Sequence, residues 1–329
     1  MKIFVTGITG FVGGAIANHF ATLGHEVTGL GRKDSLPPHV SSDCNYIQAD
    51  ISKPLEPIGA DIVIHAAGLA SDTASFKDLH LINSQGTFNV VSASKEVKHF
   101  VHISSSSVYH FKDFPMEEMD AGKCYEKLSE YGKSKFLAEQ HIQAARVNKK
   151  TILRPRAIYG IHDQSLLPRL LKLVKWNKLL LPQNLSKKIS LTHIDNLIQA
   201  VKLCTDTQSK AMKIYNVADA EVYDLHNVLT ILLPLAVGKP LQLVRIPAMI
   251  FNLFVALNNK LNLDRSFNLF AAASLTSTAV MSIEKIRHQM GYNPARNFSN
   301  SYPEIASWIH QEHGWKNIMD QPIYLNQIA

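Results

Sequence analysis

The stretch TGITGFVG, residues 6–13, places glycines at positions 7, 10 and 13 directly after the apolar run KIFVT at residues 2–6. The apolar run predicts a buried strand, and the residues that follow the glycines have the apolar spacing of a helix. Glycine lets the chain turn tightly out of the strand and lets the backbone approach a ligand without a Cβ in the way. Because the first turn of a helix presents free N–H groups, the stretch predicts a site for the pyrophosphate of a dinucleotide.

Strand-like runs alternate with longer helical patterns through the first half of the chain. We expect strands at residues 2–6, 26–30, 45–48, 61–65, 99–104, 151–154 and 213–218, and helices at residues 12–23, 76–97 and 131–147. This alternation predicts an α/β fold with a doubly wound parallel sheet. After residue 155 the pattern loosens into proline-punctuated helices, such as the one expected over residues 166–176. We therefore expect a dinucleotide-binding domain of residues 1–155 and about 189–218, and a smaller, mostly helical substrate domain of about 156–188 and 219–329.

Composition excludes several classes of protein. The 329 residues are 46% hydrophobic and 19% charged, which is the balance of a globular protein. Cys44, Cys124 and Cys204 lie far apart and no HExxH occurs, so neither a disulfide framework nor a metal site is indicated. The net charge of +7 comes from short, scattered basic clusters without interleaved aromatics. This pattern argues against nucleic acid as a partner and favours a modest preference for anionic ligands.

Membrane segments are not indicated either. No apolar run reaches the ~20 residues that a spanning helix needs, and the glycine-rich start lacks the cleavage site of a signal peptide. We therefore expect a cytoplasmic protein. The most apolar stretch, AMIFNLFVAL at 248–257, is interrupted by Asn252. We interpret it as a pocket wall or domain core, with an interfacial membrane helix as the alternative.

The spacing GxxGxxG and further motifs along most of the chain resemble the extended branch of the short-chain dehydrogenase/reductase superfamily. The matching motifs are HAAG (65–68), NSQGT (83–87), YGKSK (131–135), LRP (153–155), YG (159–160) and THIDN (192–196). The resemblance implies a Rossmann fold, a nicotinamide dinucleotide cofactor, a small-molecule substrate and a homodimer formed through residues 76–97 and 131–147. The cofactor-binding residues that it implies are Gly7, Gly10, Phe11, Val12, Gly13, Asp50, Ile51, Ala66, Ala67, Gly68, Asn83, Tyr131, Lys135 and Pro155, with Asp50 at the adenine.

The end of the second expected strand decides between NAD and NADP. An acidic residue there binds the ribose 2′-hydroxyl, whereas an arginine accommodates a 2′-phosphate. The sequence has Gly31 where NAD-preferring relatives tend to carry Asp, followed by Arg32 and Lys33. We therefore predict NADP rather than NAD, with a solvated basic turn as the alternative interpretation of Arg32 and Lys33.

Tyr131 and Lys135 lie four residues apart in a helical pattern and therefore share one face. A tyrosine pKa of ~10 is too high for a base near neutral pH, but a neighbouring ammonium lowers it. Tyr131 can then exchange a proton with an alcohol or carbonyl oxygen. By resemblance, Lys135 also holds the nicotinamide ribose, and a serine orients the substrate oxygen. Counting back four residues from Tyr109 in ISSSSVYH selects Ser105, with Ser106 as its rival.

Two features favour an apolar substrate. The segment LRPRAIYG has Ala157 where nucleotide-sugar enzymes of this branch usually carry an asparagine that contacts the diphosphate. Residues 154–171 resemble the 3β-hydroxysteroid dehydrogenase branch, which acts on sterols or long-chain oxo compounds. We predict an oxidoreductase that interconverts a secondary alcohol and a ketone on a sterol-like or long-chain 3-oxo substrate.

Two other functions stay open. One is a nucleotide-sugar epimerase or dehydratase with bound NAD, for which Arg156 or Arg169 could supply a cation. The other is a non-catalytic, NADP-sensing regulator on the same fold, since a fold does not fix a function.

Overall fold

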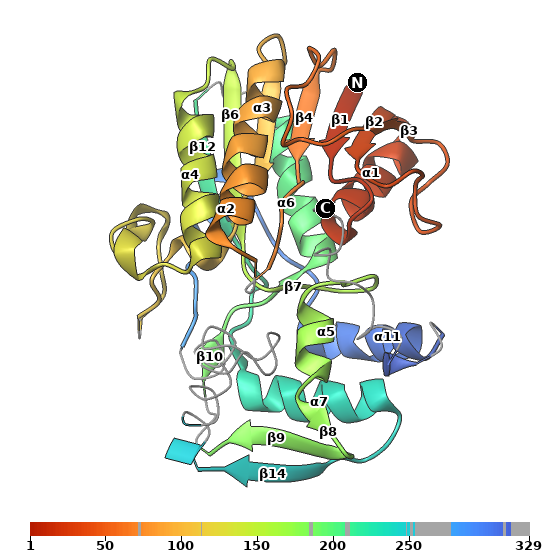
Figure 1. Cartoon of the computed structure of the whole chain (residues 1–329), viewed down its shortest axis with the longest axis vertical. Helices are drawn as coiled ribbons and strands as arrows, with labels where there is room; N and C mark the ends of the chain where they lie inside the picture. The colour runs from red at the N-terminus through yellow and green to blue at the C-terminus, as the bar shows by residue number, and fades with distance from the viewer. Residues whose placement is uncertain are drawn as a thin grey trace.

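The computed structural model of the chain describes residues 1–71, 74–112, 114–183, 187–207, 211–247, 249–250, 253, 278–311 and 314–316. Figure 1 shows two parts: a large sheet with helices on both faces, and a smaller part below it built on α5, α7, α11 and a short sheet. Within the described residues, no helix is both long and apolar enough to cross a membrane. Of the apolar stretch 248–257, only Met249, Ile250 and Leu253 are described, and the rest lies outside the described residues.

The large sheet has seven strands in the order β12–β6–β5–β4–β1–β2–β3. They are β1 (Lys2–Thr6), β2 (Glu26–Gly31), β3 (Asn45–Gln48), β4 (Ile62–His65), β5 (His99–Ile103), β6 (Lys149–Pro155) and β12 (Lys213–Val217). Every pairing in this sheet is parallel. The central strands β4 and β5 are buried throughout, as expected for a sheet that is covered on both sides. The predicted strands and the doubly wound fold are confirmed.

Helices cover the two faces of this sheet. On one face lie α1 (Phe11–Thr22) and α6 (Ile194–Asp206), and on the other lie α2 (Phe76–Leu79), η1 (His80–Gln85), α3 (Gly86–Ala93) and α4 (Glu130–Ala144). Side chains of neighbouring residues in β1 lie on opposite faces of the sheet. Val5 packs with α1 and α6, and Phe4 packs on the other face. The helix predicted over residues 76–97 is divided by a π-helical turn at η1 and ends at Ala93.

The smaller part contains α5 (Leu166–Leu171), α7 (Leu225–Val237), α11 (Phe298–Gln311) and a sheet in the order β14–β9–β8. Its strands are β8 (Val174–Lys175), β9 (Lys178–Pro182) and β14 (Gln242–Ile246). The prediction of one helix over residues 166–176 is wrong beyond Leu171. Trp176 and Asn177 adopt positive φ angles of 48° and 61°, which turn the chain into a β8–β9 hairpin.

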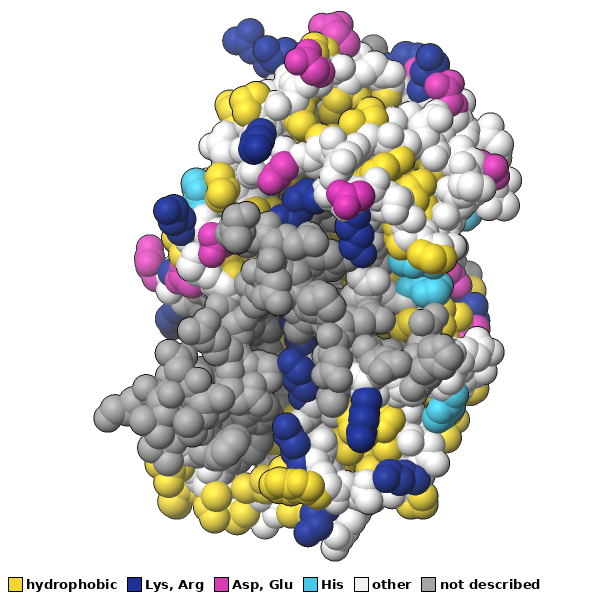
Figure 2. Space-filling view, turned by 45° about the vertical axis from the view of Figure 1, so that its right-hand side comes forward, with side chains coloured by type: hydrophobic (Ala, Val, Ile, Leu, Met, Phe, Trp, Pro, Cys, Tyr) yellow, Lys and Arg dark blue, Asp and Glu magenta, His cyan; other side chains and the backbone are white. Residues whose placement is uncertain are grey.

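The remaining elements are short. They are β7 (Ile158–Tyr159), β10 (Lys188–Ile189), β11 (Thr192–His193), β13 (Tyr223–Asp224), the 3₁₀ turns η2 (Ser106–Val108), η3 (Glu118–Asp120) and η4 (Tyr125–Lys127), and the helix α10 (Glu284–Met290). The smaller part has an apolar core of its own, drawn from residues 159–191, 223–236 and 279–309. We therefore propose two domains, here called the sheet domain (the large sheet with α1–α4 and α6) and the small domain (α5, α7, α11, β8, β9 and β14). Figure 2 shows Asp and Glu side chains mostly on the sheet domain, and Lys and Arg among apolar side chains on the small domain.

Candidate active site

A groove of about 230 Å³ lies at the carboxyl ends of β1, β2 and β4. The order of the strands reverses between β1 and β4, and ligands of open α/β sheets bind at such a switch point. The structure brings most of the predicted cofactor residues together here: Gly7, Gly10, Phe11, Val12, Gly13, Arg32, Lys33, Asp50, Ile51, Ala66, Ala67 and Gly68 all line the groove.

The glycines leave bare backbone at the N-terminus of α1. Gly7 has a φ of 74°, and a β-carbon placed on it would lie 2.8 Å from the Cα of Ala67. A β-carbon on Gly13 would lie 2.2 Å from the carbonyl oxygen of Gly7. Both approaches are closer than any side chain allows, so the turn packs directly against the loop after β4. This cradle of backbone N–H groups at a helix N-terminus fits the pyrophosphate of a dinucleotide.

The end of the groove next to β2 has no acidic residue at position 31. A β-carbon on Gly31 would lie 2.9 Å from Cγ2 and 3.0 Å from Oγ1 of Thr9, so the Thr9 side chain fills the space where an acid would begin. Thr9 also lines the groove and was not predicted from the sequence. The half-buried Arg32 and Lys33 follow, and Gln48 fixes this turn by donating from Nε2 to the carbonyl oxygen of Arg32 at 3.2 Å.

A loop next to the small domain forms the opposite side of the groove. Gln164 and Ser165 line it, and neither was predicted as a site residue. The buried carboxylate of Asp163 holds this loop by accepting from the backbone N–H groups of Ser165, Leu166 and Leu167 at 2.8–3.0 Å. Burial raises the pKa of Asp163. The signal in the sequence was the spacing of Asp163 from α5, which is typical of a carboxylate that caps a turn.

The predicted acid–base pair lies on α4 beside this groove. Ser129 caps the helix by accepting from the N–H of Gly132 at 3.0 Å, and Tyr131 follows in the first turn, half-buried. Lys135 is 4% exposed, and its Nζ donates to the carbonyl oxygen of Ile103 at 2.8 Å. A β-carbon on Gly68 would lie 3.9 Å from Lys135 Nζ, so the ammonium borders the groove. Burial lowers the pKa of Lys135 to about 8, against an opposing effect of Glu139.

The serine loop follows β5 and contacts α4. Ser105 Oγ accepts from the N–H of Ser107 and donates to Ser107 Oγ, both at 3.1 Å. Ser105 is half-buried, whereas Ser106 is buried. A β-carbon on Gly132 would lie 2.2 Å from the carbonyl oxygen of Ser107, so only glycine lets the loop approach the helix. Gly132 was not predicted as a site residue, although glycine is unfavourable inside a helix and therefore signals a close contact.

Asn83 and Pro155 do not line the groove. Asn83 lies beneath the loop after β4, where its Oδ1 accepts from the N–H of Leu69 at 2.7 Å and its Nδ2 donates to the Leu69 carbonyl and to Ser134 Oγ. Pro155 ends β6 next to Val217 of β12. Asn83 thereby holds in place the loop that carries Ala66, Ala67 and Gly68.

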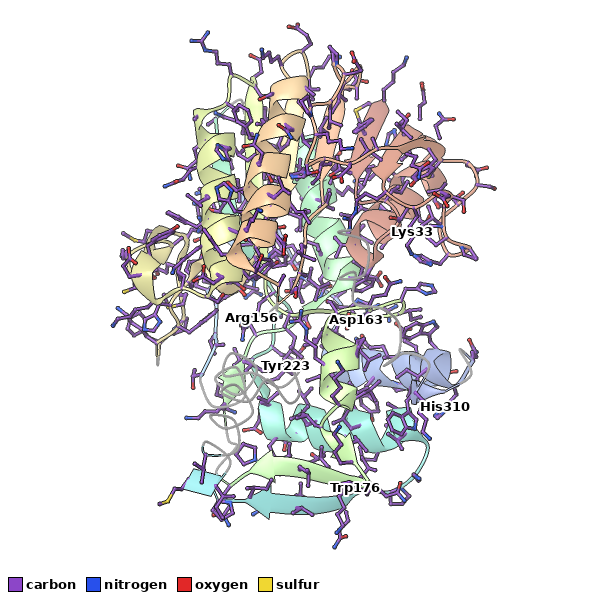
Figure 3. The ribbon with its side chains drawn as sticks, in the orientation of Figure 1. Lys33, Arg156, Asp163, Trp176, Tyr223 and His310 are labelled. Carbon is purple, nitrogen blue, oxygen red and sulfur yellow. The ribbon has the colours of Figure 1, made fainter. Side chains whose placement is uncertain are left out.

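A second cavity of about 110 Å³ opens in the small domain, below the serine loop. Its walls are almost wholly apolar and come mainly from α5 and α7, with Ile189, Leu191 and Phe298 between them. Arg156 and Asp163 are the charged residues on its wall, and Figure 3 shows both at the junction of the two domains. The cavity could therefore receive the apolar part of a substrate whose polar part lies near the serine loop.

Arg156 is a cation that lies next to the serine loop and on the wall of the apolar cavity. Its Nη1 lies 3.5 Å from Ser106 Oγ, and its guanidinium carbon lies 4.6 Å from the centre of the Phe111 ring. The buried Nε has no hydrogen-bond partner, and no described carboxylate pairs with this side chain. Burial lowers the pKa of Arg156 to about 10, which leaves it charged at neutral pH.

The groove and the helix that carries Tyr131 and Lys135 together define an enzyme of the extended short-chain dehydrogenase/reductase type. The chain belongs to the NAD dependent epimerase/dehydratase family, whose model matches residues 3–218. The predicted family, enzyme class and dinucleotide cofactor are thereby confirmed.

Relatives of the chain include reductases and epimerases. It is 30% identical over 317 residues to 2-alkyl-3-oxoalkanoate reductase of Stenotrophomonas maltophilia (strain K279a), covering 89% of this chain and 95% of that protein. It is 26% identical over 327 residues to UDP-glucose 4-epimerase of Vibrio cholerae, covering 93% and 94%. The solved structure of UDP-glucuronic acid 4-epimerase from Bacillus cereus in complex with NAD is similar with a TM-score of 0.73 at 20% identity, covering 94% and 99%.

Proposed function

We propose that the protein is a nicotinamide-dependent reductase of 3-oxo acids with an apolar chain, and that it interconverts the 3-oxo group and a secondary alcohol. The observation that carries this proposal is Arg156, a cation that pairs with no carboxylate of the described residues and lies on the wall of an apolar cavity next to the serine loop. An arginine fork binds a carboxylate through two parallel hydrogen bonds. Burial of an alkyl chain in the apolar cavity contributes ~25 cal/mol of binding free energy per Å² of chain removed from water. A 3-oxo acid has both groups, with its ketone between them.

The reaction moves a hydride and a proton. The cofactor, when bound, supplies the hydride to the carbonyl carbon or accepts it in the reverse direction. Tyr131 gives its phenolic proton to the carbonyl oxygen, and the buried ammonium of Lys135 favours the phenolate that remains. The hydroxyl of Ser105 donates a hydrogen bond that orients the same oxygen. Arg156 holds the carboxylate, so that the ketone two carbons away faces Tyr131.

The size of the cavity supports an alkyl chain over a sterol. Pockets that enclose drug-sized ligands usually measure ~300–1,000 Å³, whereas this cavity measures about 110 Å³. A slender chain fits such a space better than four fused rings. The relative from Stenotrophomonas maltophilia, a 2-alkyl-3-oxoalkanoate reductase, supports the same substrate class.

A nucleotide-sugar epimerase receives less support. Ala157 has a φ of 43°, a conformation that asparagine and glycine adopt more readily than alanine. An asparagine would suit this backbone conformation, but alanine has no amide to bind a diphosphate. The regulator hypothesis is disfavoured because both Tyr131 and Lys135 are present.

NADP is the cofactor form that we propose. Support comes from the absence of an acid at Gly31, from the Thr9 side chain that fills its place, and from Arg32 at the same end of the groove. A guanidinium there would pair with the 2′-phosphate.

The test uses stable 3-hydroxy acids of increasing chain length and follows the reduction of NADP and of NAD. Arg156→Met should lower kcat/KM for the acid about ten- to a hundredfold, the value of a charge-assisted hydrogen bond. For the methyl ester of the same acid, Arg156→Met should change kcat/KM less than twofold. Arg156→Lys should recover part of the loss that Arg156→Met causes with the acid. Tyr131→Phe should lower turnover ~10²–10⁴-fold for both substrates with cofactor affinity unchanged.

The serine assignment and the rival functions need separate measurements. Ser105→Ala should lower turnover more than Ser106→Ala does. Calorimetric titration with UDP should show no binding. Micromolar binding of UDP, together with no turnover of any 3-hydroxy acid, would overturn the proposal in favour of the epimerase.

We also propose a homodimer through η1, α2, α3 and α4. Phe76, Leu81 and Phe88 are 39%, 38% and 46% exposed on these elements and would be covered by a second copy. Phe88→Ser should shift the sedimentation coefficient from that of a dimer to that of a monomer.

A further inference from the structure

The small domain holds the positive charge of the whole chain. Residues 164–194 contain six Lys and Arg residues, residues 225–263 contain three, and neither segment contains Asp or Glu. Since the chain has 34 basic and 27 acidic residues, these two segments account for its entire positive net charge. The sheet domain is therefore close to neutral, and the molecule is strongly polarised.

Large apolar side chains are exposed at the far end of the same domain. Trp176 is 90% exposed at the tip of the β8–β9 hairpin, and Met249, Ile250 and Leu253, which follow β14, are 82%, 57% and 59% exposed. The hairpin tip is joined to the start of β14, because Asn177 accepts from the N–H of Gln242 at 3.1 Å. Figure 3 shows Trp176 at the end of the molecule that lies farthest from the sheet domain.

Exposed cations lie beside Trp176 and along β14, which runs from the hairpin tip toward Met249. We call the basic end the group of Lys175, Trp176, Lys178, Lys239, Arg245, Met249, Ile250 and Leu253, all of which are exposed. Lys175 and Lys178 flank the Trp176–Asn177 turn, Lys239 precedes β14, and Arg245 lies on β14. In Figure 2 this part of the molecule shows Lys, Arg and apolar side chains, and no acidic side chain is visible among its described residues.

We propose that the basic end docks reversibly on an anionic lipid surface. Tryptophan and aliphatic side chains enter the boundary between headgroups and acyl chains, while lysine and arginine pair with anionic headgroups. A second copy of this chain would face the same positive charge and be repelled. A nucleic acid would pair with the cations but would leave Met249 and Ile250 in water. A bilayer surface with anionic headgroups matches both the charge and the apolar side chains.

This contact goes beyond the proposed reaction and does not depend on it. A chain-bearing substrate would partition into the same bilayer, and the apolar cavity lies in the domain that docks.

The first test is co-sedimentation of the full chain with vesicles of phosphatidylcholine alone and of phosphatidylcholine with phosphatidylglycerol. We expect binding to the anionic vesicles only, and weaker binding as salt screens the charges. Emission from Trp176 should shift to shorter wavelength on binding, because its ring leaves water. Trp176→Phe should abolish that shift, which separates it from any signal of the other two tryptophans.

The second test compares two double variants with the same change in net charge. Lys175→Glu/Lys178→Glu should weaken vesicle binding at least twenty-fold, since each basic residue near an anionic surface contributes about fivefold. Lys53→Glu/Lys95→Glu, at exposed positions of the sheet domain, should change binding less than about threefold. Circular dichroism and the thermal midpoint serve as folding controls, so the outcome is independent of enzyme activity.

Three results would overturn the proposal. They are the absence of binding to anionic vesicles, equal losses in the two double variants, and a dimer in solution that Lys175→Glu/Lys178→Glu dissociates. The last result would identify the basic end as a contact between copies of the chain.

Discussion

Lys135 shows, at the scale of one residue, how a function can oppose stability. Its ammonium is buried, and burial lowers its pKa from 10.5 to about 8. The unfolded chain therefore holds this proton more tightly than the folded chain does. The resulting destabilisation is fully present below pH 8 and disappears as the pH rises through 10.5. At 1.36 kcal/mol per pKa unit, it is about 3 kcal/mol.

We therefore expect Lys135→Met to raise the free energy of unfolding at pH 7 by about 1–3 kcal/mol while it abolishes turnover. Urea denaturation at pH 7 and at pH 10.5 measures the effect, and the gain should shrink at the higher pH. Lys95→Met, which removes an exposed ammonium, should change the stability by less than about 0.5 kcal/mol. A Lys135→Met protein less stable than the parent at pH 7 would contradict this account of the buried charge.

The contact between Thr9 and Gly31 limits which side chain position 31 can carry, and only the structure reveals this contact. Gly31→Asp alone should damage the groove, because its β-carbon would lie 2.9 Å from Thr9. The double variant Thr9→Gly/Gly31→Asp makes room for the acid. Its ratio of kcat/KM with NAD to that with NADP should rise about tenfold or more, through a hydrogen bond to the ribose and repulsion of the 2′-phosphate. If the single variant switched preference as well as the double variant, Thr9 would not be the obstacle.

The residues of the groove divide into those that a local pattern reveals and those that it does not. Gly7, Gly10 and Gly13 were predictable because strand, turn and helix are adjacent in the sequence. Thr9 opposes a residue of the next strand, and Gly132 opposes a serine carbonyl on another loop. Such contacts join segments far apart along the chain, so no local spacing identifies them.

At the scale of elements, one buried network of hydrogen bonds and an ion pair joins the serine loop to β6, α4 and β12. Arg154 of β6 pairs with Glu139 of α4 through Nη2 at 2.6 Å and Nε at 2.9 Å, and both side chains are buried. Ser104 Oγ donates to Glu139, and Arg154 Nη1 donates to the hydroxyl of Tyr109 at 2.8 Å. Tyr109 in turn donates to Asn216 of β12 at 2.6 Å. The network fixes both ends of the serine loop.

Removing one partner of the Arg154–Glu139 ion pair should lower the free energy of unfolding strongly, and replacing both partners by apolar residues should lower it less than the two single losses together. Arg154→Met leaves a buried carboxylate unpaired and should lower the free energy of unfolding by about 3–5 kcal/mol. Arg154→Met/Glu139→Leu should lose clearly less than the sum of the single losses, because no charge then remains unpaired. Urea denaturation of the four proteins gives the coupling. The exposed pair Lys202–Asp206 is the matched control, and Lys202→Met should cost less than about 1 kcal/mol. Additive losses at Arg154 and Glu139 would contradict the account.

The inner strands β1, β4 and β5 of the large sheet were predictable because each is a short apolar run that is almost wholly buried. The small domain was less predictable. Strand β9 pairs with β14, which lies far along the chain, and the hairpin before it depends on positive φ angles at Trp176 and Asn177. Asn177 tolerates such an angle, but one asparagine after an apolar helical pattern does not by itself distinguish this turn from a continued helix.

At the scale of the whole molecule, the sheet domain holds four buried histidines that are neutral when folded. Burial lowers the pKa of His65 and His99 to about 3 and that of His193 to about 4, and it holds the pKa of His102 well below its usual value. His65 bridges Thr6 and Thr87 at 2.7 and 2.8 Å, and the ring of His102 stacks on it with centres 5.1 Å apart. The groove and the core below it therefore depend on uncharged imidazoles.

We expect the protein to unfold cooperatively in mild acid. A histidine whose folded pKa is depressed contributes stability that is present above its unfolded pKa of 6.5 and is lost as the pH falls through that value toward the folded pKa. Below pH 6, each of the four histidines should lower the free energy of unfolding by about 1.4 kcal/mol per pH unit, so the four together should lower it by about 5 kcal/mol per unit. Burial raises the pKa of Asp163 and Asp219 and works in the opposite direction. With a typical stability of ~5–15 kcal/mol, the midpoint of acid unfolding should lie between about pH 4 and 5.5.

Urea denaturation between pH 7.5 and 5 should therefore show uptake of three to four protons on unfolding. His99→Gln should remove about one of them, and His288→Gln, at an 80% exposed side chain, should remove none. Uptake of one proton or fewer by the parent protein would show that the buried imidazoles do not govern its acid stability.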